Sequence, residues 1–112
     1  MSTEIHYYRG DSYPYVAYVT DTDTGNPIDL TAATLTMTVD SSKNPSDDST
    51  KLFTVTGVLV DAANGEASFT PSTTNNDLSP GTYYYDIQIE QGTVVRTLVK
   101  DKYVITQDIT KV

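Results

Sequence analysis

Apolar and polar side chains alternate along much of this chain, and no stretch has the three-to-four-residue spacing of an amphipathic helix. The clearest alternation runs over residues 34–40, where Leu35, Met37 and Val39 share one face and threonines share the other. A period of two places successive side chains on opposite faces of a β-strand. The pattern therefore predicts an all-β protein.

The same alternation, interrupted by Gly, Pro, Asn and Asp, predicts seven to nine short strands. Gly57 divides one of them and predicts a bulge or a bend. Gln91-Gly92 predicts a two-residue hairpin turn. Strands spaced about ten residues apart are typical of a sandwich or a barrel. The expected strands lie at 4–9, 13–20, 27–30, 34–40, 51–60, 66–70, 82–90 and 93–100, with 102–109 extending the last or forming another.

One segment favours the sandwich. Tyr83 follows Gly81 at the start of a late strand, as in the tyrosine corner of immunoglobulin-like domains, where the ring packs in the core and the hydroxyl returns to loop backbone. The absence of Cys and Trp excludes an antibody-type domain. We therefore predict one domain over residues 1–112, an immunoglobulin-like antiparallel β-sandwich. Its predicted core contains Leu35, Met37, Val39, Val55, Phe69, Tyr83, Tyr85, Ile87 and Ile89.

Composition narrows the range of partners. The net charge of −8 opposes binding to nucleic acid and to anionic membranes, because both depend on Lys and Arg. No apolar run approaches the roughly 20 residues that span a bilayer, and no segment has the pattern of a signal peptide. Nine tyrosines accompany only two phenylalanines, a composition that suits sheets with one solvated face.

Candidate catalytic and metal-binding residues are sparse. His6 is the single histidine and there is no cysteine, so neither a nucleophile–base pair nor a zinc site is predicted. Asp21, Asp23 and Asp29 faintly resemble a calcium loop, but Ala32 stands where that loop needs a bidentate Glu. We expect these aspartates to form turns. The prediction is a protein that is not an enzyme and needs no cofactor.

Two further motifs are weaker. Arg9-Gly10-Asp11-Ser12 contains the tripeptide that integrins recognise, although Gly10 equally suits a bend between two strands. Asp47-Asp48 is a carboxylate pair in a polar loop, whereas a glycosidase needs two carboxyls on rigid elements that flank a cleft. Neither motif predicts an active site.

The N-terminal segment, residues 1–9, is the expected interaction element. Tyrosine suits interfaces because it buries a large area at low rotamer cost and keeps a polar tip. Ile5, Tyr7, Tyr8 and Tyr84 are the predicted interface residues. Two alternatives stay open: the segment is an arm that adds to a neighbour's sheet, or it is the first strand of the chain's own sheet.

Several segments in this order resemble the immunoglobulin-like domains of phage tails and baseplates, in particular the N-terminal domain of upper baseplate proteins of tailed phages. The resemblance covers residues 8–110, and the family usually has Gly where this chain has Ala32. The segments are Arg9-Gly10-Asp11-Ser12-Tyr13, Pro27-Ile28-Asp29-Leu30-Thr31-Ala32-Ala33-Thr34, Gly65-Glu66-Ala67-Ser68-Phe69 and Leu78-Ser79-Pro80-Gly81-Thr82-Tyr83-Tyr84-Tyr85-Asp86-Ile87.

The resemblance implies a structural, protein-binding component of a phage virion, made in the host cytoplasm, whose partners are other tail, baseplate or capsid proteins or further copies of itself. Because no coiled coil or receptor-binding appendage follows Val112, it implies a tail or baseplate adaptor and not the receptor-binding protein. Two alternatives remain: a capsid decoration protein, and a carbohydrate-binding module that attaches to host surface glycans, for which Tyr84 offers a weak platform.

Overall fold

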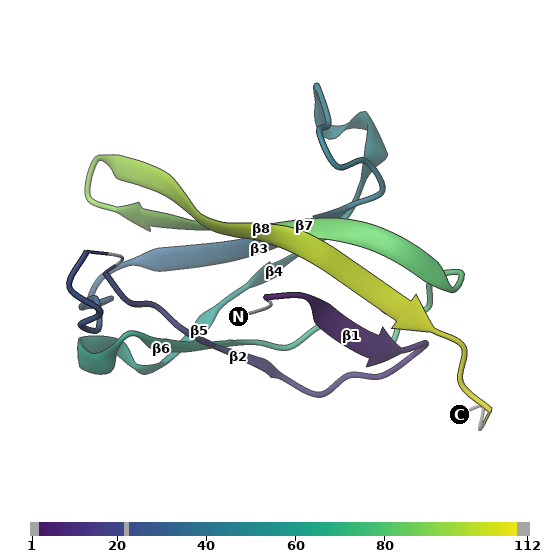
Figure 1. Cartoon of the computed structure of the whole chain (residues 1–112), viewed down its shortest axis with the longest axis horizontal. Coiled ribbons are helices and arrows are strands. Elements are labelled where there is room, and N and C mark those ends of the chain that lie inside the picture. The colour runs from purple at the N-terminus through teal and green to yellow at the C-terminus, as the bar shows by residue number, and fades with distance from the viewer. Residues whose placement is uncertain (1–2, 22, 110–112) are drawn as a thin grey trace.

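The computed structural model describes residues 3–21 and 23–109. Residues 1–2 of the expected arm, Thr22 of the expected turn and residues 110–112 lie outside the described residues. Within the described ranges, eight strands form two sheets that face each other (Figure 1). The strands are β1 (Ile5–Tyr8), β2 (Tyr15–Tyr18), β3 (Thr34–Asp40), β4 (Lys51–Thr56), β5 (Val58–Asp61), β6 (Glu66–Phe69), β7 (Gly81–Gln91) and β8 (Val94–Thr106), with short 3₁₀ helices η1 (Asp48–Thr50) and η2 (Ala62–Asn64).

The strand order is that of an immunoglobulin-like sandwich. One sheet has the order β1-β8-β7-β3-β4 and the other has the order β2-β6-β5. Apart from the first strand, this is the division of an immunoglobulin domain, in which the second, fifth and sixth strands face a sheet built on the last two strands and the third. The predicted all-β sandwich is confirmed.

The sequence predicted a wholly antiparallel sandwich. In the structure one pair of strands departs from this, because β1 pairs in parallel with β8. Ile5 is opposite Tyr103, and Tyr8 is opposite Thr106. Parallel neighbours need a long connection, and here the rest of the domain supplies it. The segment at 4–9 is therefore a strand of the chain's own sheet, the second of the two alternatives.

Three local predictions differ from the structure. In place of the expected strand at 27–30, only Pro27 pairs, in an isolated bridge with Thr20. Pro has no N–H to donate to a longer ladder of hydrogen bonds. The turn between β7 and β8 is Gly92-Thr93, one residue later than predicted, with Gly92 in the left-handed region at φ 63°. Residues 93–100 and 102–109 belong to one strand, β8, which ends at Thr106.

Gly57 divides the predicted strand at 51–60 more completely than a bulge does. The chain leaves the five-stranded sheet after β4 and enters the three-stranded sheet with β5. A Cβ on Gly57 would lie 2.9 Å from Cε1 of Phe69 and 3.3 Å from Cβ of Leu35. The crossing point thus passes so close to the core that only Gly fits without displacing its neighbours.

The core lies between the sheets and agrees with the predicted alternation. Of the predicted core residues, Tyr83 is partly buried and the others are buried. The Tyr83 hydroxyl donates to the backbone oxygen of Ser79 at 2.7 Å, which is the predicted return to loop backbone. Ile5, Tyr7, Leu30, Ala67, Tyr103 and Ile105 complete the buried apolar cluster.

Ala32 adopts the left-handed conformation at φ 63°, the one non-glycine residue to do so in the described ranges. A Cβ is disfavoured in this region, and Gly populates it freely. At position 32 the chain therefore has a backbone conformation that suits Gly, although the residue is Ala.

Candidate functional site

The predicted interface residues do not form one surface. The side chains of Ile5 and Tyr7 point into the core, where the residues are 3% and 2% exposed, so they are not surface residues of this chain. Tyr8 is 58% exposed, and Tyr84 is half-buried on the outward-facing side of β7. Tyr8 is opposite Thr106 and Tyr84 is opposite a different part of β8, so the two do not neighbour each other in the register.

The tripeptide Arg9-Gly10-Asp11 is built into the fold. Nε of Arg9 donates to Oδ1 of Asp77 at 2.8 Å, and the Gly10 N–H donates to the carbonyl oxygen of Asn76 at 2.9 Å. The carbonyl oxygen of Asp11 accepts a further bond from the Asn76 amide at 2.7 Å. These contacts hold the segment against residues 71–80, where it serves as the bend that Gly10 suggested.

The aspartates of the faint calcium motif form turns, as predicted. Oδ1 of Asp21 accepts from the N–H of Asp23 at 2.8 Å. Oδ1 of Asp29 accepts from both the hydroxyl and the N–H of Thr31, and these bonds lower the pKa of the Asp29 carboxyl. Over residues 3–21 and 23–109, no three His, Asp or Glu side chains gather as a metal-binding group, and no helix is long and apolar enough to span a membrane.

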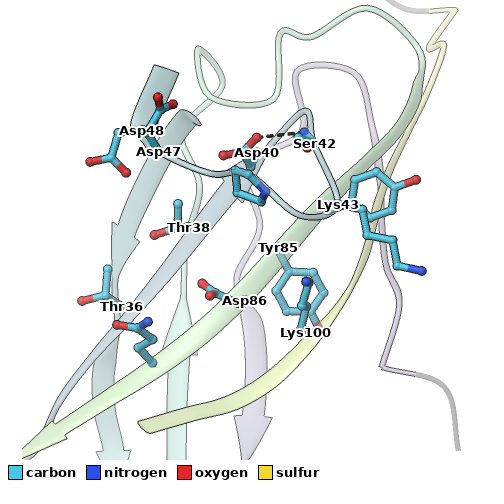
Figure 2. A pocket seen from close by; sticks show the side chains of 13 residues that line it. Thr36, Thr38, Asp40, Ser42, Lys43, Asp47, Asp48, Tyr85, Asp86 and Lys100 are labelled. Atoms are coloured by element: carbon cyan, nitrogen blue, oxygen red, sulfur yellow. Dashed lines mark hydrogen bonds between the residues drawn. The ribbon is translucent and has the colours of Figure 1, made fainter. Parts of the chain in front are cut away.

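A cleft of about 300 Å³ lies on the outer face of the five-stranded sheet, and we call it the polar cleft. Its floor consists of outward side chains of β3, β7 and β8, and the loop at 41–50 forms a wall (Figure 2). Figure 2 shows Asp86 between the threonines of β3 and Lys100 of β8. The lining residues are Thr36, Thr38, Asp40, Ser42, Lys43, Pro45, Asp47, Asp48, Tyr84, Tyr85, Asp86, Gln88 and Lys100.

Hydrogen bonds fix the wall of the polar cleft to the sheet. Oδ1 of Asp40 accepts from the Ser42 N–H at 2.8 Å and from the Thr50 hydroxyl at 2.7 Å, which ties both ends of the loop together. Nearer the middle of the loop, Nζ of Lys100 donates to Oδ1 of Asn44 at 2.7 Å. The cleft is therefore formed before any ligand arrives.

Asp86 is the electrostatic centre of the polar cleft. Burial raises the pKa of its carboxyl, and the Lys100 ammonium on the neighbouring strand opposes that rise. Asp47 differs, because its carboxylate accepts from the Ser49 side chain and N–H, and these bonds lower its pKa. A half-buried carboxylate beside an ammonium is suited to binding polar groups.

A second surface lies on the opposite side of the sandwich, on the outer face of the three-stranded sheet. Val16, Tyr18, Val58 and Val60 are exposed there, and we call them the apolar face. Val16 and Val58 both pair with Ser68, on its two sides, so they belong to one row across the sheet. Sequence reasoning missed the apolar face. Of the polar cleft it named only Tyr84, although the outward alternation of Thr36, Thr38 and Asp86 was a further signal.

No family model matches the chain, and no curated protein matches it. Four chains of solved structure do match. One is an uncharacterized protein from Bacillus anthracis str. Ames, with 15% sequence identity, coverage of 92% of this chain and 76% of that chain, and a TM-score of 0.42. The two surfaces are therefore interpreted from their own side chains.

Proposed function

We propose that this domain is a non-catalytic, protein-binding component of a phage virion, serving as an adaptor in a tail or baseplate. The resemblance to phage immunoglobulin-like domains supports the location in a virion. The apolar face supports the binding of another protein, and it is the observation on which the proposal chiefly rests. Tyr18 and Val58 are 69% and 64% exposed there, on the outer side of the three-stranded sheet.

In the isolated domain, the side chains of the apolar face are in contact with water. Exposed apolar side chains that gather on one face mark a surface that another protein covers, because covering them removes apolar area from water. Glu66 is on the central strand β6, between Tyr18 of β2 and Asp61 of β5, so a carboxylate lies within the apolar face. The expected partner is a virion subunit with an apolar patch that also carries Lys or Arg.

The test combines particle composition with paired variants. Tyr18→Ser with Val58→Thr removes apolar area from the face, whereas Val94→Thr with Val95→Thr makes a similar change at the β7–β8 hairpin, where each valine is 57% exposed. We expect the first pair to abolish incorporation into particles and the second pair to preserve it. Equal incorporation of both pairs would contradict binding through the apolar face.

Imaging of particles labelled with an antibody to this chain then locates the domain. Label at the tail or baseplate supports the adaptor role, and label on the head shows a capsid decoration protein instead. Purified particles that lack the chain would overturn the virion assignment itself.

A further inference from the structure

We propose that the polar cleft binds a short segment of a neutral saccharide. This inference concerns the opposite side of the sandwich from the apolar face and does not rest on the virion assignment. The cleft volume of about 300 Å³ is at the lower end of the range of small-molecule sites. A short oligosaccharide segment is a ligand of that class.

The floor of the cleft has unused hydrogen-bonding capacity. The hydroxyls of Thr36 and Thr38, the amide of Gln88 and the carboxylate of Asp86 make no hydrogen bond to any other residue in the ranges 3–21 and 23–109. Threonine hydroxyls and the Gln amide both donate and accept, and a carboxylate accepts. Sugar hydroxyls also donate and accept, so they match such a mixed set.

The sheet register fixes these groups relative to one another. Thr38 is opposite Asp86, and Thr36 is opposite Gln88. Directly opposed side chains have Cβ atoms about 5 Å apart, and successive side chains on one face of a strand are about 7 Å apart. The four groups therefore form a rigid grid on two hydrogen-bonded strands, and sites on strands hold their geometry better than sites on loops.

Charge argues for a neutral ligand. Four carboxylates, those of Asp40, Asp47, Asp48 and Asp86, outnumber the two ammonium groups of Lys43 and Lys100 in the cleft and repel an anion. The ammonium of Lys100 already faces Asp86, so a ligand cation would compete with it for the one carboxylate at the centre of the floor. A neutral ligand needs no counter-charge and can use donors and acceptors of both kinds.

Tyr84 completes the site at the end of the floor. It follows the same outward alternation on β7 as Asp86 and Gln88, and it is half-buried among the lining residues. An aromatic ring supplies apolar area and a hydroxyl at low conformational cost. The sequence suggested Tyr84 as a weak platform by itself, and the structure adds the grid of polar groups beside it.

The experiment titrates the intact chain with millimolar neutral oligosaccharides of glucose, galactose, mannose and N-acetylglucosamine while backbone amide NMR signals are recorded. Sialylated oligosaccharides and a Lys-rich peptide serve as charged comparisons. We expect at least one neutral sugar to shift the amides of Thr36, Thr38, Asp86 and Gln88 in a saturable way. The inference is overturned if no neutral sugar shifts them, or if a charged probe binds the cleft more tightly.

Variants make the test specific. Gln88→Ala and Thr38→Val each remove one hydrogen-bonding group, and we expect each to weaken binding about three- to tenfold. Thr106→Val makes the same change as Thr38→Val on the outer side of β8, away from the lining residues, and should leave affinity unchanged. If Gln88→Ala and Thr38→Val bind the sugar as tightly as Thr106→Val does, the proposed site is contradicted.

The two proposals can fail separately. The Tyr18→Ser, Val58→Thr variant should still bind sugar, because its changes lie on the other sheet. The Gln88→Ala variant should still enter particles. Gln88 is exposed, so its replacement is not expected to disturb folding.

Discussion

The side-chain amide of Asn76 donates a 2.7 Å hydrogen bond to the carbonyl oxygen of Asp11, which is 65 positions earlier in the chain. Asn76 is fully buried, and its Oδ1 accepts from the hydroxyl of Tyr103 on β8. One side chain thus joins the connection before β7, the bend after β1 and the last strand. Buried polar groups are stable when both donors and acceptors are satisfied, as they are here.

Replacing Asn76 by Ala should lower the free energy of unfolding by about 2–4 kcal/mol, because it leaves the Tyr103 hydroxyl and the Asp11 carbonyl without their buried partner. Urea unfolding followed by circular dichroism measures this loss. Asn26→Ala at an exposed position is the control and should change stability by less than about 0.5 kcal/mol. Similar values for the two variants would contradict the bridging role.

The strand β1 should be essential for stability because Ile5 and Tyr7 lie in the core. Ile5→Ala should cost about 2–5 kcal/mol. His6→Ala, on the outward face of the same strand, should cost little. Deleting residues 1–8 should abolish the cooperative melting transition. A truncated chain that still melts cooperatively would show that this segment belongs to another molecule's sheet.

Gly57 and Phe69 should be energetically coupled. Phe69→Ala should cost about 3–5 kcal/mol because the ring is fully buried. Gly57→Ala should cost about 1–3 kcal/mol, since the added methyl would lie within 3.0 Å of that ring. In the double variant the methyl meets no ring, so the combined loss should be smaller than the sum. Strict additivity in urea unfolding would mean that the contact does not strain the core.

Stability should fall at alkaline pH. Burial is the main cause that raises the pKa of Tyr7, Tyr85 and Tyr103 above the ordinary value of 10.0. The unfolded chain then loses these protons at a lower pH than the folded chain. The contribution of the three tyrosines to the free energy of unfolding is therefore fully present below about pH 10 and decreases above it. Urea midpoints measured from about pH 8 to 11 test this, and a constant midpoint would contradict it.

The variant Tyr7→Phe refines the alkaline prediction. It removes a buried ionisable hydroxyl, whose bond to the carbonyl oxygen of Tyr13 is 2.9 Å, and should reduce the fall in stability above about pH 10. Tyr18→Phe removes an exposed hydroxyl and serves as the matched control. The two slopes are compared with that of the unaltered chain.

Features that depend on neighbours in the sequence were predictable. The alternation over 34–40 placed Leu35, Met37 and Val39 inside because the side chains of a strand alternate in any fold. The bond from Tyr83 to Ser79 spans four residues and follows from local chain geometry. Asp21 and Asp29 form turns with residues two positions away, so their role was also local.

Features that depend on distant pairing were decided by the tertiary structure. The alternation around Ile5 is the same whether the segment is an arm or a strand of the chain's own sheet. Only the pairing of Ile5 with Tyr103 places it in the core. The polar cleft likewise exists because Thr38 and Asp86, far apart in the chain, are opposite each other beneath the loop at 41–50. Alternation states which face a side chain occupies. It carries no information on which strand will lie beside it, because that choice is made by the packing of the whole core.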